Sequence, residues 1–431
     1  MIVRELIEKI EGEAELEFSF DRGKIEDVKI NFGFYRGIEE ILKGKAARDA
    51  LVITPRVCGI CNHAHLIAAV RAIESSYADA GVPIAISGKA KSIREFTLAC
   101  ELIQNHTKWL YMTILPRLEK LLGVESGENH PLKASYLSST ITRALAIFAG
   151  QWPHSSYAVP GGVTCDPTYV DVMQAESLLD ASTAFFEQVV AGISLEQYLE
   201  IDSLSSLHHI GGDLGKILHL MGSEGMSQKG YSHDRFIAFG SCLFFESGKS
   251  LATTVSNVDV RYVEEAVQEG STAKAVSYRQ RFYETGPLAR AMVRKEPIVK
   301  SLHKRYKDSL LTRVFARVHE IALLLKYSKE LLQQLRLDEP SCVLTGHQIK
   351  IPDGTGVGVV EAARGSLIHR TTIREGAIEA YEIIVPTQWN LSRGSETERG
   401  VAVEAMVGSS TTEEASFIFR TFDVCSVCTT Q

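Results

Sequence analysis

Two Cys-x-x-Cys pairs at opposite ends of the chain constrain its fold more than any other feature. The first is Cys58-Gly59-Ile60-Cys61, and the second is Cys425-Ser426-Val427-Cys428, close to the final Gln431. Each pair places two thiolates about one turn apart, so that both can bind one metal, and two pairs make a four-sulfur site. We therefore expect a fold that brings its C-terminal segment back against its N-terminal region.

Spacing alone leaves simpler interpretations of the cysteines open. The two pairs are compatible with a structural zinc site, although such sites usually take their ligands from one short module. Their wide separation suits a buried catalytic metal better than a zinc knuckle. The other four cysteines have no paired spacing and are expected to be buried as small hydrophobic side chains: Cys100, Cys165, Cys242 and Cys342.

The residues around both pairs resemble the two signature motifs of nickel–iron hydrogenase large subunits. These motifs are Arg56-x-Cys58-Gly59-x-Cys61-x-x-x-His65 and Asp423-x-Cys425-x-x-Cys428. The resemblance implies an α+β, mainly α fold, in which a bundle of long helices carries small peripheral β elements. Five further segments resemble the same family, in the family's order and over nearly the whole chain: Lys9-Ile10-Glu11-Gly12, Tyr35-Arg36-Gly37-Ile38-Glu39, Thr285-Gly286-Pro287-Leu288-Ala289-Arg290, Glu361-Ala362-Ala363-Arg364-Gly365 and Val385-Pro386-Thr387-Gln388-Trp389-Asn390.

The resemblance implies a nickel–iron centre held by four cysteines. Cys58 and Cys425 are expected to be terminal nickel ligands. Cys61 and Cys428 are expected to bridge nickel to an iron that carries two cyanides and one carbon monoxide. Soft thiolates suit these metals, and a thiolate can bridge two of them. The resemblance also places five residues around the diatomic ligands: Arg364, Leu367, Val385, Pro386 and Thr387.

Charged residues of the motifs are expected to act in the heterolytic cleavage of dihydrogen. A guanidinium above the metals can orient or polarise the gas, which is the role expected of Arg364, with Asp423 facing the same space. The resemblance places Glu11 near a terminal nickel thiolate and implies that it is the first proton relay. A carboxyl suits this role when burial raises its pKa. His65 is expected to donate a hydrogen bond to the sulfur of Cys61. The alternatives are a structural ion pair for Arg364 and a surface position for Glu11.

Several positions depart from the family's pattern. Ala363 and Val424 stand where the family usually has proline. Asn105, before a histidine that matches the family, stands where many relatives have aspartate, which we expect to alter the tuning of the site. Glu39 resembles a ligand of the family's second metal, usually magnesium, whose histidine partner is replaced here by Gln431. An amide oxygen or a terminal carboxylate can bind such a hard cation.

Electron transfer is expected to need a partner. No cysteine spacing outside the two pairs suits an iron–sulfur cluster, and the resemblance implies an iron–sulfur small subunit that carries the clusters. A higher-order oligomer is compatible with this arrangement. The function implied is reversible cleavage of dihydrogen. The alternative is a hydrogen sensor that signals to a kinase, whereas a related respiratory-complex subunit is excluded because that lineage has lost the metal cysteines.

Composition agrees with a large globular protein. The chain has 431 residues, 45% of them hydrophobic and 23% charged, with a net charge of −7. This charge argues against nucleic acid as a partner. No run is long and apolar enough to span a membrane, and nothing resembles a signal peptide. Thiols intended for metal suit a reducing compartment, so a cytoplasmic location is expected, although an export signal can sit on the partner subunit in this family.

The periodicity of the chain predicts one compact catalytic domain over residues 1–431. It comprises a β hairpin at 14–32, a helical body at about 37–336, a small β region at 356–385 and a C-terminal metal-ligand segment at 420–431. The stretch 200–280 has no clear period. The expected helices cover 37–44, 65–77, 89–122, 132–149, a segment capped by Asp166 and reaching 191, and 312–336, and the expected strands cover 356–363, 366–373 and 379–385.

Overall fold

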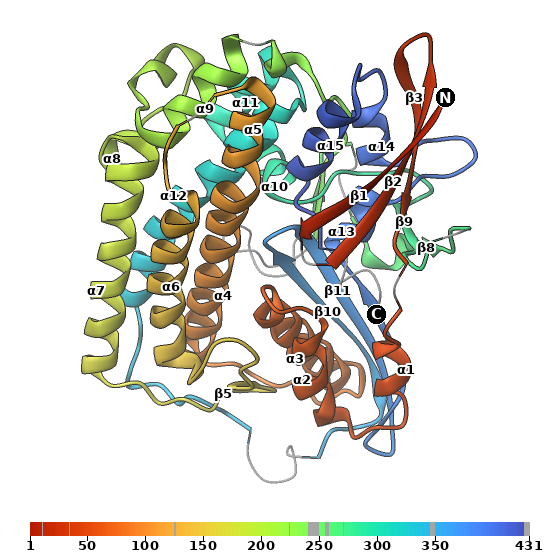
Figure 1. The fold of residues 1–431 in the computed structure, drawn as a ribbon. Helices are drawn as coiled ribbons and strands as arrows, with labels where there is room; N and C mark the ends of the chain where they lie inside the picture. The colour runs from red at the N-terminus through yellow and green to blue at the C-terminus, as the bar shows by residue number, and fades with distance from the viewer. Residues whose placement is uncertain are drawn as a thin grey trace.

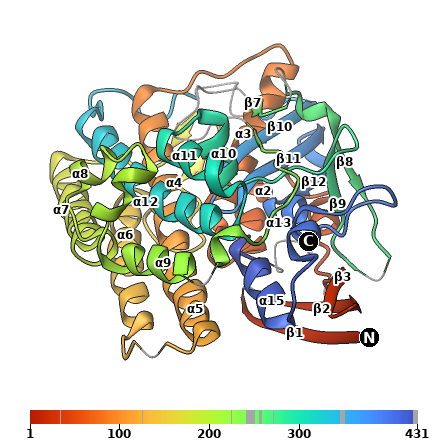
Figure 2. The same cartoon turned by 90° about the horizontal axis from the view of Figure 1, so that it is seen from above.

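The computed structural model describes residues 1–10, 12–33, 35–124, 126–223, 225–239, 250–254, 258–269, 271–344 and 350–425. Long helices lie side by side on one flank, and the larger sheets lie on the other (Figures 1 and 2). The fold is α+β and mainly α, as the sequence predicted. That the chain forms one domain stays a prediction.

The helical flank is built on α4 (Gly88–Lys108), α6 (His130–Ala149), α7 (Tyr169–Phe185) and α12 (Leu310–Gln333). These helices run next to one another in Figure 1, and most of α12 is buried. Shorter helices cover its upper end: α8 (Leu195–Leu199), α9 (Gly212–Ser223), α10 (Pro287–Arg294) and α11 (Pro297–Tyr306). The charged or polar residues on the buried side of α12 are discussed below, because they reach the candidate site.

The long helix predicted over 89–122 exists but is not uniform. Ser87 caps α4 by accepting a hydrogen bond from the backbone N–H of Ala90 (3.0 Å). A π-helical turn, η3 (Trp109–Ile114), then leads into α5 (Leu115–Leu122). Pro116 near the start of α5 has no N–H to donate to the preceding turn, and a π turn accommodates such an interruption.

The predicted cap of α7 is wrong by two residues. Thr168, and not Asp166, caps α7, in a reciprocal arrangement with Asp171. The Thr168 hydroxyl and the Asp171 carboxylate each bind a backbone N–H of the other residue, which satisfies two otherwise unpaired donors. A second π turn, η4 (Phe186–Ala191), extends the helix to the predicted end.

Two three-stranded antiparallel sheets account for the predicted strands. The predicted hairpin is β2 (Gly12–Asp21) with β3 (Lys24–Asn31), and β1 (Ile2–Ile10), which was not predicted, pairs with β2. The predicted β region is β10 (Gly354–Ala362), β11 (Gly365–Arg374) and β12 (Ala377–Ile384) in that order.

Helix α3 (Asn62–Asp79) lies directly on β10, and glycines allow this contact. A Cβ on Gly356 or Gly358 would come within 1.9 Å of the carbonyl oxygen of Ala72 or Ala68. No side chain fits there, so α3 approaches the sheet backbone. This approach positions the start of α3, and hence the first cysteine pair, against the sheet.

The remaining elements are short. The unassigned stretch 200–280 forms α9 and the two-stranded pairs β6 (Ile237–Phe239) with β7 (Ser250–Ala252) and β8 (Val263–Ala266) with β9 (Ala275–Tyr278). The described residues also form short helices and one small strand pair: α1 (Ile38–Leu42), α2 (Ala50–Ile53), α13 (Pro386–Leu391), α14 (Val401–Met406), α15 (Thr412–Thr421), and β4 (Ala158–Val159) with β5 (Gly162–Val163). Among the described residues, no helix is long and apolar enough to cross a membrane.

Candidate metal centre

Three of the four predicted cysteine ligands meet in the interior. Cys58 follows a short 3-10 turn, Cys61 caps α3, and Cys425 lies beyond the end of α15. Their sulfur atoms all lie within 4.8 Å of one another, and the three side chains are buried. The Sγ atoms of Cys58 and Cys425 are 3.6 Å apart, well beyond the roughly 2.05 Å of a disulfide bond.

This sulfur geometry fits a soft metal. Tetrahedral coordination with metal–sulfur bonds of about 2.3 Å separates neighbouring sulfurs by roughly 3.8 Å, close to the Cys58–Cys425 distance. The backbone N–H groups of Ile60 and Cys61 point at the Cys58 sulfur, at 3.5 and 3.3 Å. Because Cys61 caps a helix, the positive end of the helix dipole also favours thiolates here. The predicted ligands Cys428 and Gln431, and the predicted relay Glu11, lie outside the described residues.

Arg364 forms the roof of the site. It lies in the turn between β10 and β11, buried, and its guanidinium donates to the backbone carbonyl of Asp423 (3.0 Å), to the Asp423 carboxylate (3.2 Å) and to the amide oxygen of Asn105 (3.2 Å). Burial by itself lowers the pKa of Arg364, but Asp423 and the nearby cysteines raise it well above its ordinary value. Arg364 is therefore a permanent cation, and the sequence rightly grouped it with Asp423.

Arg317 is part of the same roof and was not predicted. It extends from α12, is buried, and donates to Oδ2 of the Asp423 carboxylate at 2.5 Å, an oxygen that also lies 3.2 Å from Nε of Arg364. Its guanidinium also lies over the ring of Trp109, 4.7 Å from the centroid. Burial lowers the pKa of Arg317, partly offset by Asp423. Arg317 lies among the inward-facing positions of the helix predicted over 312–336. A charged residue at such a position was the sequence signal that could have identified it.

Asp423 also reverses the chain so that Cys425 reaches the site. It follows the end of α15 with φ of 60°, the left-handed conformation that commonly ends helices. Asparagine and aspartate adopt this conformation more readily than other non-glycine residues. The two arginines therefore bind a residue whose backbone sets the direction of the last described segment.

A small internal cavity gathers the predicted pocket residues. Its walls contain Cys61 and His65, together with all four residues predicted around the diatomic ligands beside Arg364: Leu367, Val385, Pro386 and Thr387. The Thr387 hydroxyl is buried and has no hydrogen-bond partner among the described residues. An orphaned buried hydroxyl beside apolar walls fits a pocket that binds small polar ligands. Burial lowers the pKa of His65 to about 4, so its ring is neutral.

Glu101 holds the first cysteine segment and was also not predicted. Its carboxylate accepts the backbone N–H groups of His63 (2.8 Å) and Ala64 (2.9 Å) at the start of α3. Burial raises the pKa of Glu101 to about 8. A capping carboxylate supplied by another helix leaves no local sequence signal.

The described contacts of Glu39 do not involve the cysteines, Arg364 or Asp423. Its carboxylate accepts the backbone N–H of Ile383 (2.7 Å) and lies 3.6 Å from the ammonium of Lys274. Burial raises the pKa of Glu39. A magnesium role for Glu39 stays a prediction.

The unpaired cysteines are only partly as expected. Cys100 is buried, Cys165 is partly exposed, and Cys242 lies outside the described residues. Cys342 is exposed, so the expectation of a buried side chain is wrong there. It follows α12 in a connecting segment near Pro160, where little apolar structure covers it.

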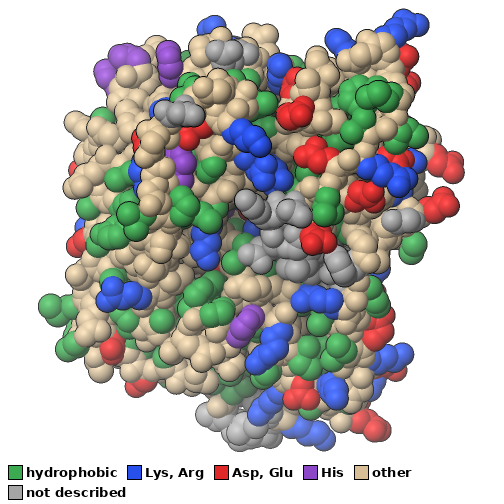
Figure 3. All heavy atoms as spheres, in the orientation of Figure 1, with side chains coloured by type: hydrophobic (Ala, Val, Ile, Leu, Met, Phe, Trp, Pro, Cys, Tyr) green, Lys and Arg blue, Asp and Glu red, His purple; other side chains and the backbone are tan. Residues whose placement is uncertain are grey.

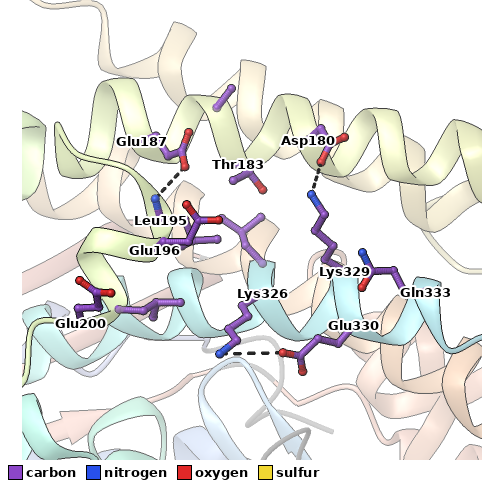
Figure 4. A pocket seen from close by; sticks show the side chains of 13 residues that line it. Asp180, Thr183, Glu187, Leu195, Glu196, Glu200, Lys326, Lys329, Glu330 and Gln333 are labelled. Atoms are coloured by element: carbon purple, nitrogen blue, oxygen red, sulfur yellow. Dashed lines mark hydrogen bonds and ion pairs between the residues drawn. The ribbon is translucent and has the colours of Figure 1, made fainter.

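Two of the larger hollows on the surface of the described residues differ in their distance from the site. One, of about 640 Å³, leads to the roof and is lined by Ile60, Trp109, Met112, Arg364 and Val424 among others. The other, of about 670 Å³, lies between α7, α8 and α12, away from every predicted site residue (Figure 4). Its acidic side chains outnumber its two lysines, which are both engaged in ion pairs. The face seen in Figure 3 carries charges of both signs.

The site is thus a buried thiolate centre for soft metals, roofed by fixed cations, in a mainly helical fold. The model of the nickel-dependent hydrogenase family matches residues 36–115 and 239–431, well over half of the chain. The chain belongs to this family: it is a hydrogenase large subunit, an oxidoreductase that cleaves dihydrogen at a nickel–iron centre.

Individual relatives are distant but match over nearly full length. The chain is 25% identical to the periplasmic [NiFeSe] hydrogenase large subunit of Desulfomicrobium baculatum, covering 93% of this chain and 88% of the relative. It is also 25% identical to the sulfhydrogenase 1 subunit alpha of Pyrococcus furiosus, covering 98% and 96%. The solved [NiFeSe] hydrogenase of D. vulgaris Hildenborough has the same fold, with a TM-score of 0.83 at 21% identity and full coverage of both chains.

The relatives leave two predictions without support. None of the names given above refers to a sensor, so the sensor alternative is not favoured. One relative is named periplasmic and another is named an uptake hydrogenase, so the cytoplasmic location stays a prediction.

Proposed function

We propose that this chain holds nickel and iron through four thiolates, from Cys58, Cys61, Cys425 and Cys428. The convergence of three of these sulfurs within 4.8 Å, from opposite ends of the sequence, is the observation that carries the proposal. The fourth, Cys428, is proposed from its spacing after Cys425. When bound, the metals would accept hydride and polarise dihydrogen while a thiolate accepts the proton.

The cavity beside Cys61 is proposed to hold two cyanides and one carbon monoxide on the iron. Its apolar walls, Leu367 and Val385, suit small ligands that must be kept from water. The free hydroxyl of Thr387 would donate one hydrogen bond to such a ligand.

Arg364 is proposed to orient dihydrogen above the metals, with Asp423 fixing the plane of the guanidinium. Asn105 contributes an uncharged oxygen to Arg364, so the roof has one negative charge fewer than with the aspartate of many relatives. His65 would donate a hydrogen bond to the Cys61 sulfur. Glu11 would accept the proton from the site and pass it toward solvent, as the resemblance implies.

Electrons are proposed to leave through an iron–sulfur small subunit, the usual partner of a hydrogenase large subunit. The surface hollow lined by Ile60, Met112 and Val424 reaches Arg364 and Asp423. The partner subunit would cover this hollow. Covering it would keep water from the site, which strengthens the electrostatic effect of Arg364. A heterodimer in the cytoplasm, and a magnesium ion held by Glu39 and Gln431, complete the proposal.

The test compares wild-type holoenzyme with Cys425→Ser and, as a matched control, Cys342→Ser on the exposed cysteine. Metal analysis, infrared spectra and dihydrogen oxidation are measured on each. Serine is a poor ligand for soft metals, so Cys425→Ser should lose nickel and turnover, whereas the control keeps both. Full nickel content with normal turnover in Cys425→Ser would refute the four-thiolate site, and absence of cyanide and carbon monoxide bands in wild type would refute the diatomic ligands.

A further inference from the structure

Three buried polar side chains form a hydrogen-bonded row behind the cavity that His65 lines. Nδ1 of His65 lies 3.1 Å from Nε2 of His369 in β11. Nδ1 of His369 lies 2.8 Å from the hydroxyl oxygen of Tyr381 in β12. All three side chains are buried, at 1%, 0% and 5% exposure. The row therefore runs from the cavity across one face of the sheet, in the buried interior.

The packing of α3 on the sheet brings these residues together. His369 is the register partner of Gly358, whose missing side chain allows the close approach of α3 described above. Tyr381 pairs with Thr371, two residues along β11, and so is the diagonal neighbour of His369 on the same face. The row is thus fixed by strand register and by one glycine.

Only one direction of hydrogen bonding satisfies the row. The Tyr381 hydroxyl has no partner other than His369 among the described residues, so its buried proton must be donated to Nδ1 of His369. A neutral imidazole has one donor and one acceptor nitrogen. His369 therefore carries its proton on Nε2 and donates it to Nδ1 of His65, and His65 carries its own proton on Nε2.

The charge states agree with this direction. Burial lowers the pKa of His369 well below its ordinary value, so this ring is neutral. Burial raises the pKa of Tyr381, so the phenol keeps its proton.

We propose that Tyr381 and His369 are positioning residues that fix His65 as the Nε2–H tautomer, which makes this N–H the donor to the cavity and to the Cys61 sulfur. A fixed donor of this kind tunes the ligand that it binds. The consequence at Cys61 rests on the proposed thiolate site, but the tautomers are a property of the protein alone.

The test measures histidine tautomers in the full chain without metals. Two-bond ¹H–¹⁵N correlation spectra of protein labelled with ¹⁵N-histidine distinguish a protonated from an unprotonated ring nitrogen. His65→Gln and His369→Gln assign the two rings by loss of their signals. We expect the Nε2–H tautomer for both. An Nδ1–H tautomer or a doubly protonated ring at His65 would overturn the proposal.

Tyr381→Phe then tests the origin of the polarity. Without the phenol hydroxyl, neither histidine ring is held in one tautomer. Signals of the Nδ1–H forms of His369 and His65 should therefore become visible. Tyr157→Phe is the matched control. Tyr157 is also buried, and its hydroxyl lies 3.2 Å from Nε2 of His63, which lies on α3 as His65 does. Unchanged signals in Tyr381→Phe would show that the phenol does not set the row.

His369→Leu and His369→Gln form a second pair that does not depend on the phenol. The glutamine amide can still donate to Nδ1 of His65, whereas leucine cannot. We expect His65 to keep its Nε2–H tautomer only with glutamine, and equal spectra in both variants would overturn the proposal. Correct tautomers in a protein that never acquires cyanide and carbon monoxide bands would instead contradict the proposed function.

Discussion

Replacing Arg317 by methionine tests whether buried charge, rather than apolar packing, holds the C-terminal segment. Arg317 and Arg364 both bind the Asp423 carboxylate, and Arg317 also lies on Trp109. Methionine keeps much of the apolar volume on the indole but leaves the carboxylate with a single cation. Arg317→Met should therefore act mainly through Asp423.

The size of the effect follows from burial. Removing one partner of a buried ion pair costs about 3–5 kcal/mol, and loss of a desolvated cation–π contact about 2 kcal/mol. Because Arg364 still neutralises Asp423, we expect the free energy of unfolding to fall by about 3 kcal/mol, a change on the order of a hundredfold in the unfolding equilibrium. Nickel content should fall as well, because Cys425 follows Asp423 closely.

The assay is urea unfolding of the metal-free chain, followed by helical circular dichroism and extrapolated linearly to water. Arg336→Met is the control, since the ion pair of Arg336 with Asp338 is exposed and such pairs contribute about 0–1 kcal/mol. Combining Arg317→Met with Asp423→Asn should cost less than the sum of the single variants. A loss below about 1 kcal/mol with additive effects would refute the reasoning.

Three further predictions concern the site and its support. Arg364→Lys should load metals normally but lose most dihydrogen oxidation, because an ammonium cannot reproduce the planar guanidinium fork; near-normal turnover would reduce Arg364 to a structural role. Glu11→Gln should keep metal content while exchange of dihydrogen with deuterated solvent collapses, and normal exchange would place the proton relay elsewhere. Gly358→Ala should lower the free energy of unfolding by about 1–3 kcal/mol through collision with Ala68, whereas Gly222→Ala, with open space around it, should be neutral or stabilising.

Local patterns of hydrophobic residues predicted the helices and strands. The motifs shared with the hydrogenase family predicted which parts of the chain meet at the site. Alternation predicted β2 and β3, and helical periodicity predicted α4, α6 and α12, because both depend on neighbouring residues. The cap of α7 was assigned to Asp166 because an Asp-Pro pair favours a helix start, but the reciprocal bonds of Thr168 and Asp171 satisfy more donors. The π turn before α5 is associated with Pro116, whose effect on the helix a search for hydrophobic periodicity does not detect.

The candidate site divides in the same way. Residues inside motifs, such as Arg364 and Thr387, line one cavity, and their place around diatomic ligands stays a prediction. Arg317, Glu101 and the pair His369–Tyr381 were missed, since each acts through a residue on a distant element. A buried charge within an apolar helical face was visible in the sequence, but its partner was not, because the partner lies far along the chain.

One stripe along α4 and the π turn η3 that continues it connects both cysteine segments and explains why their sulfurs meet. Residues four apart on a helix share a face, and three such positions each bind a different part of the site. Glu101 accepts the N–H groups at the start of α3, Asn105 donates to the carbonyl of Ile60 (2.7 Å) between the first two cysteines, and Trp109 donates to the carbonyl of Arg420 (2.9 Å) before Cys425. Arg317 on the neighbouring α12 then binds Asp423 over the same indole. The separation of the two cysteine segments is therefore set by anchors on one continuous helix and by the contact of Arg317 with Asp423.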